Sequence, residues 1–343
     1  MARRVKKNNC WENLQGFQYA HRGLFHQPLS ASRKLSASVA KNPLRSKPDA
    51  AKGIVSSREQ AAAGTPEETG ALKASCTKKL FWEEDIARWK EDGRRIVPEN
   101  SMGAFRMAVR YGFGSELDVH LTADGKLVVL HDETLLRMTG INAKAEDMTW
   151  PELSKLRLLE TASRIPLLEE ILDLYTSDRA LTGRRDARAD RRGAFLHLPL
   201  IIELKSEGNV RELCRHVMEL IDRYPALNYC VESFDPRVVL WFCRHRPDVF
   251  RGQLTENFMK SREAVRQWGY VMTFGMWSVV PDILTRPDFI SCRFRDRRNI
   301  FIRLSHLCGV RQVNWIIRSQ KEMRIVDREG GLSIFERFMP EMD

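Results

Sequence analysis

Hydrophobic positions along this chain fall into two repeating patterns. Short apolar runs with the length of β-strands occur at 17–21, 115–122, 127–130, 198–204, 229–233, 250–254, 270–275, 289–292, 312–318 and 332–336. Segments with apolar residues at helical spacing lie between them, at 102–111, 166–175, 210–224, 236–245 and 262–269. This alternation predicts a parallel sheet, and about eight strands favour a (β/α)8 TIM barrel. An open doubly wound sheet is the alternative, although its typical glycine-rich phosphate loop is missing from the sequence.

One long segment interrupts the pattern directly after the first strand. Residues 27–80 are rich in Ala, Ser, Lys and Pro and contain few large apolar residues. Such a composition is typical of a low-complexity insertion that is partly disordered or forms a mobile lid. An amphipathic segment at 81–89 predicts a helix that docks the insertion back onto the core. We therefore predict one domain over residues 1–343, with the insertion inside it.

Composition changes the picture mainly by excluding a membrane-spanning or secreted protein. No apolar stretch approaches the roughly 18 residues that a transmembrane helix needs. The basic N-terminus is not followed by an apolar segment, so no secretory signal is predicted. The seven cysteines are scattered and never form a C-x-x-C pair, which is typical of reduced thiols. We expect a cytoplasmic protein.

The formal net charge of +11 favours anionic partners. Basic residues gather at 179–192 and at 293–303, without the interleaved aromatic residues of a nucleic-acid-binding platform. Most of this charge is expected to lie on the solvated surface. The rest can attract an anionic substrate or make a weak contact with an anionic membrane surface, and no nucleic-acid partner is expected. The sequence does not indicate an oligomeric state.

Polar residues stand at the ends of several predicted strands, which is where a TIM barrel carries its active site. They are His21-Arg22, Glu116-Leu117-Asp118, His131-Asp132, Glu203-Leu204-Lys205 and Glu232-Ser233-Phe234-Asp235.

Three of these carboxylates indicate a metal site. Glu116 and Asp118 are two residues apart in a strand, so both side chains face the same side. Like charges side by side in an apolar strand are costly unless a cation neutralises them. Glu203 adds a third carboxylate from another strand end, and such oxygen ligands suit Mg²⁺ or Ca²⁺ rather than Zn²⁺. The alternative for Glu116 and Asp118 is a simple ion pair with a basic residue.

The remaining strand-end residues suit phosphate chemistry. His21 and His131 can act as general acid and base near neutral pH, although a single strand-end histidine is more often structural. Arg22 can hold a phosphate as a bidentate fork, and Lys205 as a point charge. Two other histidines, His120 and His197, are interpreted as structural.

Seven short motifs, in order along the chain, resemble those of the glycerophosphodiester phosphodiesterases. They are Ala20-His21-Arg22-Gly23, Pro98-Glu99-Asn100-Ser101, Glu116-Leu117-Asp118-Val119, Leu121-Thr122-Ala123-Asp124-Gly125, Val129-Leu130-His131-Asp132, Glu203-Leu204-Lys205 and Ser233-Phe234-Asp235. Each motif is short, but together they are highly specific.

The resemblance implies a TIM barrel that hydrolyses a glycerophosphodiester to glycerol 3-phosphate and an alcohol. It implies that His21 and His131 are the catalytic acid and base. It also implies that Glu116, Asp118 and Glu203 bind the divalent metal, that Arg22 and Lys205 contact the phosphate, and that Glu99 is an active-site carboxylate.

The chain departs from the resembled family at two places. The family joins its H-R-G and P-E-N motifs by a short loop, whereas 74 residues separate Gly23 from Pro98 here. The family often has Trp-Thr-x-Asn near the C-terminus, whereas this chain has Trp315-Ile316-Ile317-Arg318. Trp315 is a candidate for the substrate pocket, and a buried barrel aromatic is the alternative.

Two other functions remain open beside this hydrolysis. The first is a lysophospholipid-directed phospholipase D or a cyclising lyase on the same fold. The second is a non-catalytic polyanion-binding barrel, which the complete set of catalytic residue types makes less favourable.

Overall fold

The structure, a computed structural model, describes residues 11–15, 17–25, 97–185, 195–206, 208–257, 259, 266, 270, 273, 274, 278 and 282–341. The predicted insertion at 27–80 and the predicted helix at 81–89 lie outside these residues, so the one-domain prediction stays a prediction.

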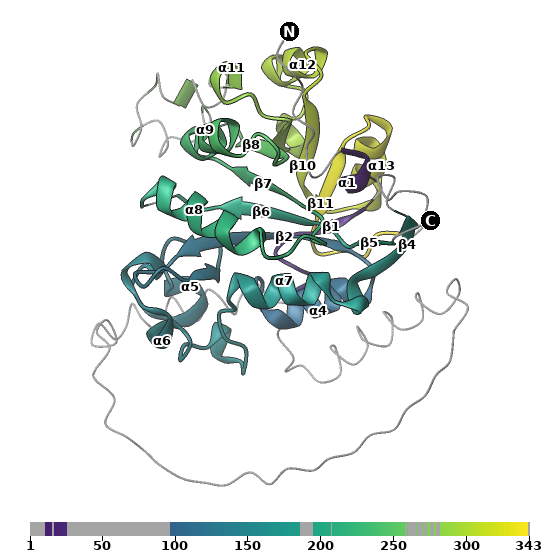
Figure 1. Cartoon of the computed structure of the whole chain (residues 1–343). Helices are drawn as coiled ribbons and strands as arrows, with labels where there is room; N and C mark the ends of the chain where they lie inside the picture. Colours follow the sequence, from purple (N-terminus) through teal and green to yellow (C-terminus); the bar gives the residue numbers. More distant parts are fainter. Residues whose placement is uncertain are drawn as a thin grey trace, which may run out of the picture.

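Eight parallel strands of the described chain close into a barrel (Figure 1), which confirms the predicted fold. The strands follow the order β1-β2-β6-β7-β8-β9-β10-β11, and β11 pairs with β1 to close the ring. Their bounds are β1 Tyr19–Ala20, β2 Gly114–Leu121, β6 Leu200–Leu204, β7 Tyr229–Ser233, β8 Arg251–Thr255, β9 Phe289–Arg293, β10 Arg311–Ile317 and β11 Leu332–Phe335.

Two antiparallel features accompany the barrel. β3 (Leu127–Val129) pairs with β2 across the turn that contains Asp124 and Gly125, as the hairpin signal in the sequence predicts. β4 (Leu181–Arg185) pairs with β5 (Phe195–His197) in a separate two-stranded sheet. The sequence predicts only a surface loop in this arginine-rich region, because charge masks the weak strand pattern.

Helices lie around the barrel and against its ends (Figure 1). They are α1 Trp11–Leu14, α4 Met102–Arg110, α5 Leu136–Thr139, α6 Trp150–Leu153, α7 Leu168–Thr176, α8 Val210–Ile221, α9 Pro236–His245, α11 Asp282–Thr285, α12 Ile300–Leu307 and α13 Gln320–Arg328, with 3₁₀ turns at Ala145–Asp147, Leu158–Glu160, Asp178–Ala180 and Phe294–Asp296. Ser101 caps α4 by accepting a hydrogen bond from the Ala104 N–H.

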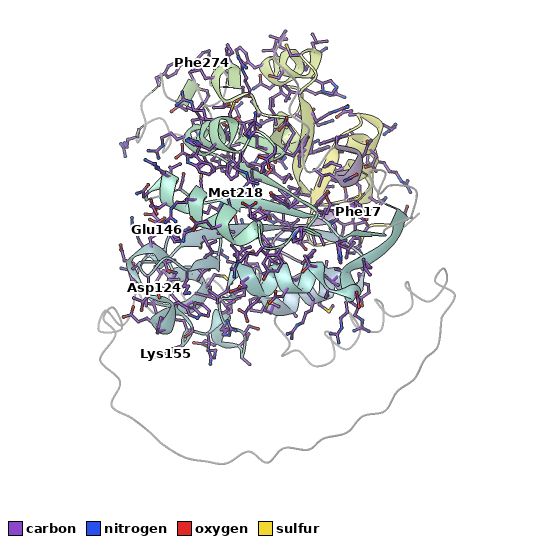
Figure 2. The ribbon with its side chains drawn as sticks, viewed as in Figure 1. Phe17, Asp124, Glu146, Lys155, Met218 and Phe274 are labelled. Atoms are coloured by element: carbon purple, nitrogen blue, oxygen red, sulfur yellow. The ribbon has the colours of Figure 1, made fainter. Side chains whose placement is uncertain are left out.

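The strand predicted at 270–275 is wrong at its described residues. Tyr270, Thr273 and Phe274 are all helical. These three residues lie in helical turns, and the Phe274 ring contacts that of Phe301 in α12 at 6.2 Å between centroids. Figure 2 places Phe274 on the side of the molecule that carries α11 and α12. Short apolar runs do not by themselves distinguish a strand from a packed helix.

The barrel has an apolar floor, formed by residues of most of its strands together with two residues of α1. The cluster contains Trp11, Leu14, Tyr19, Ile201, Cys230, Phe250, Phe289, Val313, Leu332 and Ile334, all buried. Their strand neighbours point outward: Leu200 and Ile202 pack into a second cluster with α7 and α8. Since side chains alternate along a strand, the residue two positions after each floor residue points back into the barrel, nearer the carboxyl ends of the strands.

Candidate active site

The positions two residues after the floor carry several residues of the candidate site. Tyr19 is followed in this way by His21, Ile201 by Glu203, Cys230 by Glu232, Val313 by Trp315, and Ile334 by Glu336. The barrel therefore presents a ring of polar and aromatic side chains above its apolar floor, at the carboxyl ends of the strands, where barrel enzymes hold their active sites.

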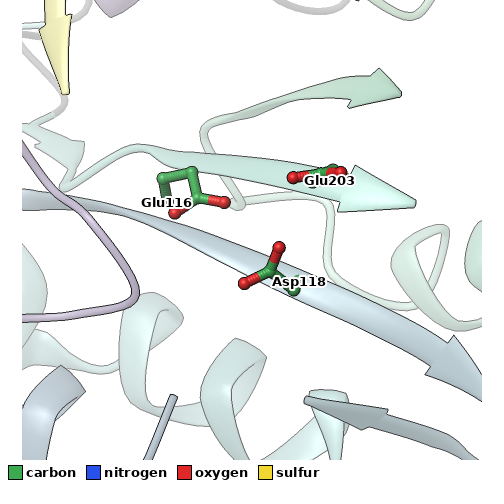
Figure 3. A group of neighbouring side chains, drawn as sticks. All are labelled: Glu116, Asp118 and Glu203. Carbon is green, nitrogen blue, oxygen red and sulfur yellow. The ribbon is translucent and has the colours of Figure 1, made fainter. Parts of the chain in front are cut away.

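Three buried carboxylates form the centre of this ring. Glu116 and Asp118 extend from β2, and Glu203 extends from the neighbouring strand β6 (Figure 3). The parallel register sets Asp118 directly beside Glu203. One carboxylate oxygen from each residue lies within 4.8 Å of the other two, and all three residues are buried.

Two cations contact the three carboxylates. The Lys205 Nζ lies 2.6 Å from Glu203 Oε1 and 2.9 Å from Asp118 Oδ1. The Arg22 Nε lies 3.4 Å from Asp118 Oδ2, and the Arg22 backbone N–H donates to Glu116 Oε2 at 3.1 Å. Both predicted phosphate-binding cations therefore lie against the predicted metal ligands.

Burial and mutual repulsion give these carboxyl groups very different pKa values. Burial, with the charges of Asp118 and Glu203, raises the pKa of Glu116 well above its usual value. Burial also raises the pKa of Glu203 to about 7 and that of Glu232 to about 8. Burial acts in the same direction on Asp118, but Lys205 and other nearby charges outweigh it and bring that pKa well below its usual value. The neighbouring cations thus stabilise only part of the negative charge.

These residues fit a hard divalent cation. Three close, buried carboxylate oxygens make the kind of ligand set that Mg²⁺ and Ca²⁺ prefer. Burial and the neighbouring carboxylates raise the pKa values of Glu116 and Glu203, so a bound cation would favour the ionised forms of both. The Lys205 ammonium, placed between Asp118 and Glu203, marks where positive charge is favoured.

His21 follows β1 and lies between two carboxylates from the strands that flank β1. Glu116 belongs to β2, and Glu336 directly follows β11. The His21 Nε2 is 3.9 Å from Glu116 Oε2, and its Nδ1 is 3.1 Å from Glu336 Oε2. Burial, with Arg22, lowers the pKa of His21, while Glu336 acts to raise it. The other oxygen of Glu336 accepts hydrogen bonds from Arg318 at 2.7 and 2.9 Å. Glu336 therefore fixes both the His21 ring and the Arg318 guanidinium.

The turn after β1 has a left-handed backbone that directs its groups into the site. Arg22 has a φ of +52°, a conformation that costs energy for a residue other than glycine. Gly23 follows at +75°, and a Cβ there would lie 2.8 Å from the Ala104 carbonyl carbon. Only glycine fits this close approach to α4, which accounts physically for the glycine in the H-R-G motif.

Glu99 and His131 lie in a second ion-pair network at the edge of the site. Glu99 Oε1 accepts hydrogen bonds from Arg22 at 2.7 Å and from Arg137 at 2.5 Å. Arg137 also donates to Asp132, whose Oδ1 is 2.6 Å from His131 Nδ1. Burial lowers the pKa of His131 to about 4, so this imidazole is neutral at pH 7. The network holds the His131 ring in place through Asp132 and Arg137.

The other predicted residues occupy less central places. Trp315 is half-buried on the rim, with its ring edge-on to Phe234 at 5.9 Å. His120 is buried on β2, where burial lowers its pKa to about 4. His197 is half-buried in β5, away from the ring.

Two residues of the site escape prediction from the sequence. Glu336 lies 315 residues from His21 in the chain, and no motif marks it. Arg137 lies in the short helix α5, in a segment without periodicity. The position of Glu336 two residues after Ile334, in the last strand, is the signal that can identify it once the barrel is assumed.

A sequence model of the glycerophosphoryl diester phosphodiesterase family matches residues 93–327. The chain belongs to this family. The family region begins just before Glu99 and includes the three carboxylates, His131 and Lys205.

Individual relatives agree with this assignment. The human protein named lysophospholipase D GDPD1 is 35% identical over 160 residues, which cover 43% of this chain and 43% of that protein. The glycerophosphodiester phosphodiesterase of Bacillus altitudinis is 45% identical over 86 residues, or 23% of this chain and 35% of the relative. The chain thus matches less than half the length of these curated relatives.

A solved structure supports the fold. The phosphodiesterase of Oleispira antarctica, in complex with its product sn-glycerol-3-phosphate, superposes with a TM-score of 0.53 at 17% identity, covering 70% of this chain and 87% of that one. Among the described residues, no helix is both long and apolar enough to cross a bilayer.

Proposed function

We propose that this protein hydrolyses glycerophosphodiesters to glycerol 3-phosphate and an alcohol, with the help of a divalent cation. The observation that carries the proposal is the ring itself: three buried carboxylates stand between two histidines and two cations, in a member of the phosphodiesterase family. The product complex of the Oleispira antarctica relative supports glycerol 3-phosphate as a product.

We propose that Glu116, Asp118 and Glu203 hold Mg²⁺ or Ca²⁺. When bound there, the cation would neutralise phosphate oxygens and favour ionisation of the attacking oxygen. Arg22 and Lys205, already beside these carboxylates, would turn toward the phosphate and stabilise the charge that develops on it. Glu99 would hold the Arg22 guanidinium in place from its far side.

His21 and His131 would move the protons. Both imidazoles have lowered pKa values, so each can accept a proton at neutral pH. The one that donates must first be protonated, which the negative charge of the approaching phosphodiester favours. One imidazole would remove a proton from the nucleophile, and the other would protonate the leaving alcohol.

The test is a substrate panel with purified protein. Glycerophosphocholine, glycerophosphoethanolamine, glycerophosphoserine and glycerophosphoglycerol are incubated with Mg²⁺, Ca²⁺ or EDTA. We expect metal-dependent release of glycerol 3-phosphate, which is lost in His21→Ala. Absence of glycerol 3-phosphate from every substrate and metal overturns the proposal.

A second candidate is the hydrolysis of lysophospholipids, since one relative is named a lysophospholipase D. We propose that the protein meets such substrates at an anionic membrane surface. Three apolar side chains of α12 are exposed, Ile300 by 56%, Leu304 by 50% and Leu307 by 83%, beside the exposed Arg303. Apolar residues next to cations suit an anionic bilayer.

Vesicle sedimentation tests this contact. We expect the protein to bind vesicles that contain phosphatidylserine more strongly than vesicles of phosphatidylcholine alone, and Leu307→Ser to weaken that binding. Equal binding to both vesicles, or none, contradicts it.

The free cysteines among the described residues support the proposed cytoplasmic location.

A further inference from the structure

A cavity of about 310 Å³ opens on the barrel rim beside the ring of site residues. It lies at the carboxyl ends of β9 and β10 and is lined by Arg293, Phe294, Arg295, Trp315, Ile316, Arg318 and Glu322. The site described above uses none of its three arginines to bind the phosphate or the metal.

The three arginines differ in how far their charges are compensated. Arg293 forms an ion pair with Glu256 at 3.0 Å, and its guanidinium lies over the Trp315 ring at 5.6 Å. Arg318 is paired with Glu336. The exposed Arg295 makes no ion pair or side-chain hydrogen bond with the part of the chain that the structure describes.

The carboxylate that lines the cavity is already engaged with the backbone. One oxygen of Glu322 accepts the Arg318 backbone N–H at 2.8 Å. Glu256 and Glu336 each face one of the two paired arginines. Arg295 therefore remains as the cation whose charge an incoming anion can compensate.

An unsatisfied donor points to a ligand independently of charge. The Trp315 Nε1 is buried and has no hydrogen-bond partner among the described residues. A buried indole N–H normally finds an acceptor, and leaving it unpaired is costly. A small shift of the half-buried Trp315 ring would be needed to bring this N–H to an oxygen atom of a group bound in the cavity.

The cavity is coupled to the catalytic ring through a single carboxylate. Glu336 contacts the His21 ring with one oxygen and the Arg318 guanidinium with the other. A group held in the cavity therefore lies one side chain away from His21. The cavity thus adjoins the ring through Trp315, and a group joined to the phosphate can extend into it.

We infer that this cavity binds an anionic group, such as a carboxylate, carried by the alcohol part of the substrate. Arg295 would pair with the anion, while the Trp315 N–H would donate to one of its oxygens. This inference rests on the proposed function and narrows its substrates. Glycerophosphoserine is then preferred over glycerophosphoethanolamine, from which it differs only by a carboxylate.

The test compares these two substrates with Arg295→Gln. We expect the wild-type kcat/KM to be about tenfold higher for glycerophosphoserine, since a charged hydrogen bond contributes on this scale. In Arg295→Gln the ratio should fall to within about twofold of one. Arg179→Gln, which removes an exposed arginine far along the chain from the cavity, should keep the wild-type ratio.

Calorimetric titration of metal-depleted protein with both compounds separates the two proposals, because it needs no turnover. If both are hydrolysed with equal kcat/KM, or if Arg295→Gln leaves the ratio unchanged, the inference fails while the proposed function stands. If neither is hydrolysed, the proposed function fails. The inference then survives only if the wild type, unlike Arg295→Gln, binds glycerophosphoserine more tightly than glycerophosphoethanolamine.

Discussion

At the scale of single residues, His21 is positioned by Glu336, a carboxylate outside the proposed set of metal ligands. Glu336 lies 3.1 Å from His21 Nδ1 and fixes the ring so that Nε2 faces the site. The surrounding hydrogen bonds of a catalytic histidine normally set both its orientation and its pKa.

Glu336→Gln tests this positioning role. We expect kcat to fall about tenfold, in the range seen when the carboxylate partner of a functional histidine is lost. Because the carboxylate raises the pKa of His21, its removal should move the limb of the pH–rate profile governed by His21 to lower pH. If the acidic limb of the profile moves, His21 is the base. If the basic limb moves, His21 is the acid. An unchanged profile contradicts the role.

Glu116→Gln tests the carboxylate centre. The amide keeps the shape of the side chain but removes a negative charge from the proposed ligand set. We expect kcat/KM to fall by at least about 100-fold and metal affinity to fall with it. Glu133→Gln is the matched control, because Glu133 is an exposed carboxylate paired with Lys144. Comparable activity of the two variants would contradict the assignment.

Metal affinity should depend on pH. The pKa of Glu203 is raised to about 7, and that of Glu116 well above its usual value. Both must lose a proton to bind metal, so protons compete with the cation and affinity falls as pH falls. We expect calorimetric affinity to rise between about pH 6 and pH 8, by up to tenfold per unit for each proton released. An affinity that is constant over this range contradicts the assignment.

At the scale of the elements, the contact between β8 and β9 depends on a residue without a side chain. Gly252 lies beside Phe289 in the parallel register, and a Cβ there would lie 2.1 Å from the Phe289 ring. The same ring stacks on Phe250 in the barrel floor at 5.6 Å. The glycine therefore makes room for the aromatic residues that support the site.

Gly252→Ala should destabilise the protein by about 1–3 kcal/mol, the usual range for overpacking a core. Gly103→Ala is the control, since a Cβ at Gly103 meets only ordinary contacts at 3.5 and 3.6 Å in α4. That change should be neutral or stabilise the protein by up to about 1 kcal/mol. Urea unfolding measures both. Equal stability of the two variants would show that the Phe289 ring can move aside.

Periodicity predicts most of the described elements to within a few residues. The helix at 236–245 and the strand at 229–233 match α9 and β7 at both ends, because each has a clear apolar face. Several elements are absent from the prediction, among them the longer helices α12 and α13. In α12 only Ile302 is buried, so its exposed apolar residues blur the amphipathic pattern.

At the scale of the whole molecule, closure of the barrel determines which residues meet. The sequence predicts His21, Arg22, Glu99, Glu116, Asp118, His131, Glu203 and Lys205, and the structure brings these together. Glu336 and Arg318 join them because β11 pairs with β1, a contact between the two ends of the chain. No local pattern encodes such a contact, which is why the sequence alone misses it.

The most direct test of the central claim is the release of glycerol 3-phosphate from glycerophosphodiesters by the full chain, measured with an added divalent metal and again with EDTA. The proposal predicts release with Mg²⁺ or Ca²⁺, abolition by EDTA, and recovery when metal is restored. Undiminished release in EDTA would contradict the metal role of the three carboxylates, and no release under any condition would contradict the function itself.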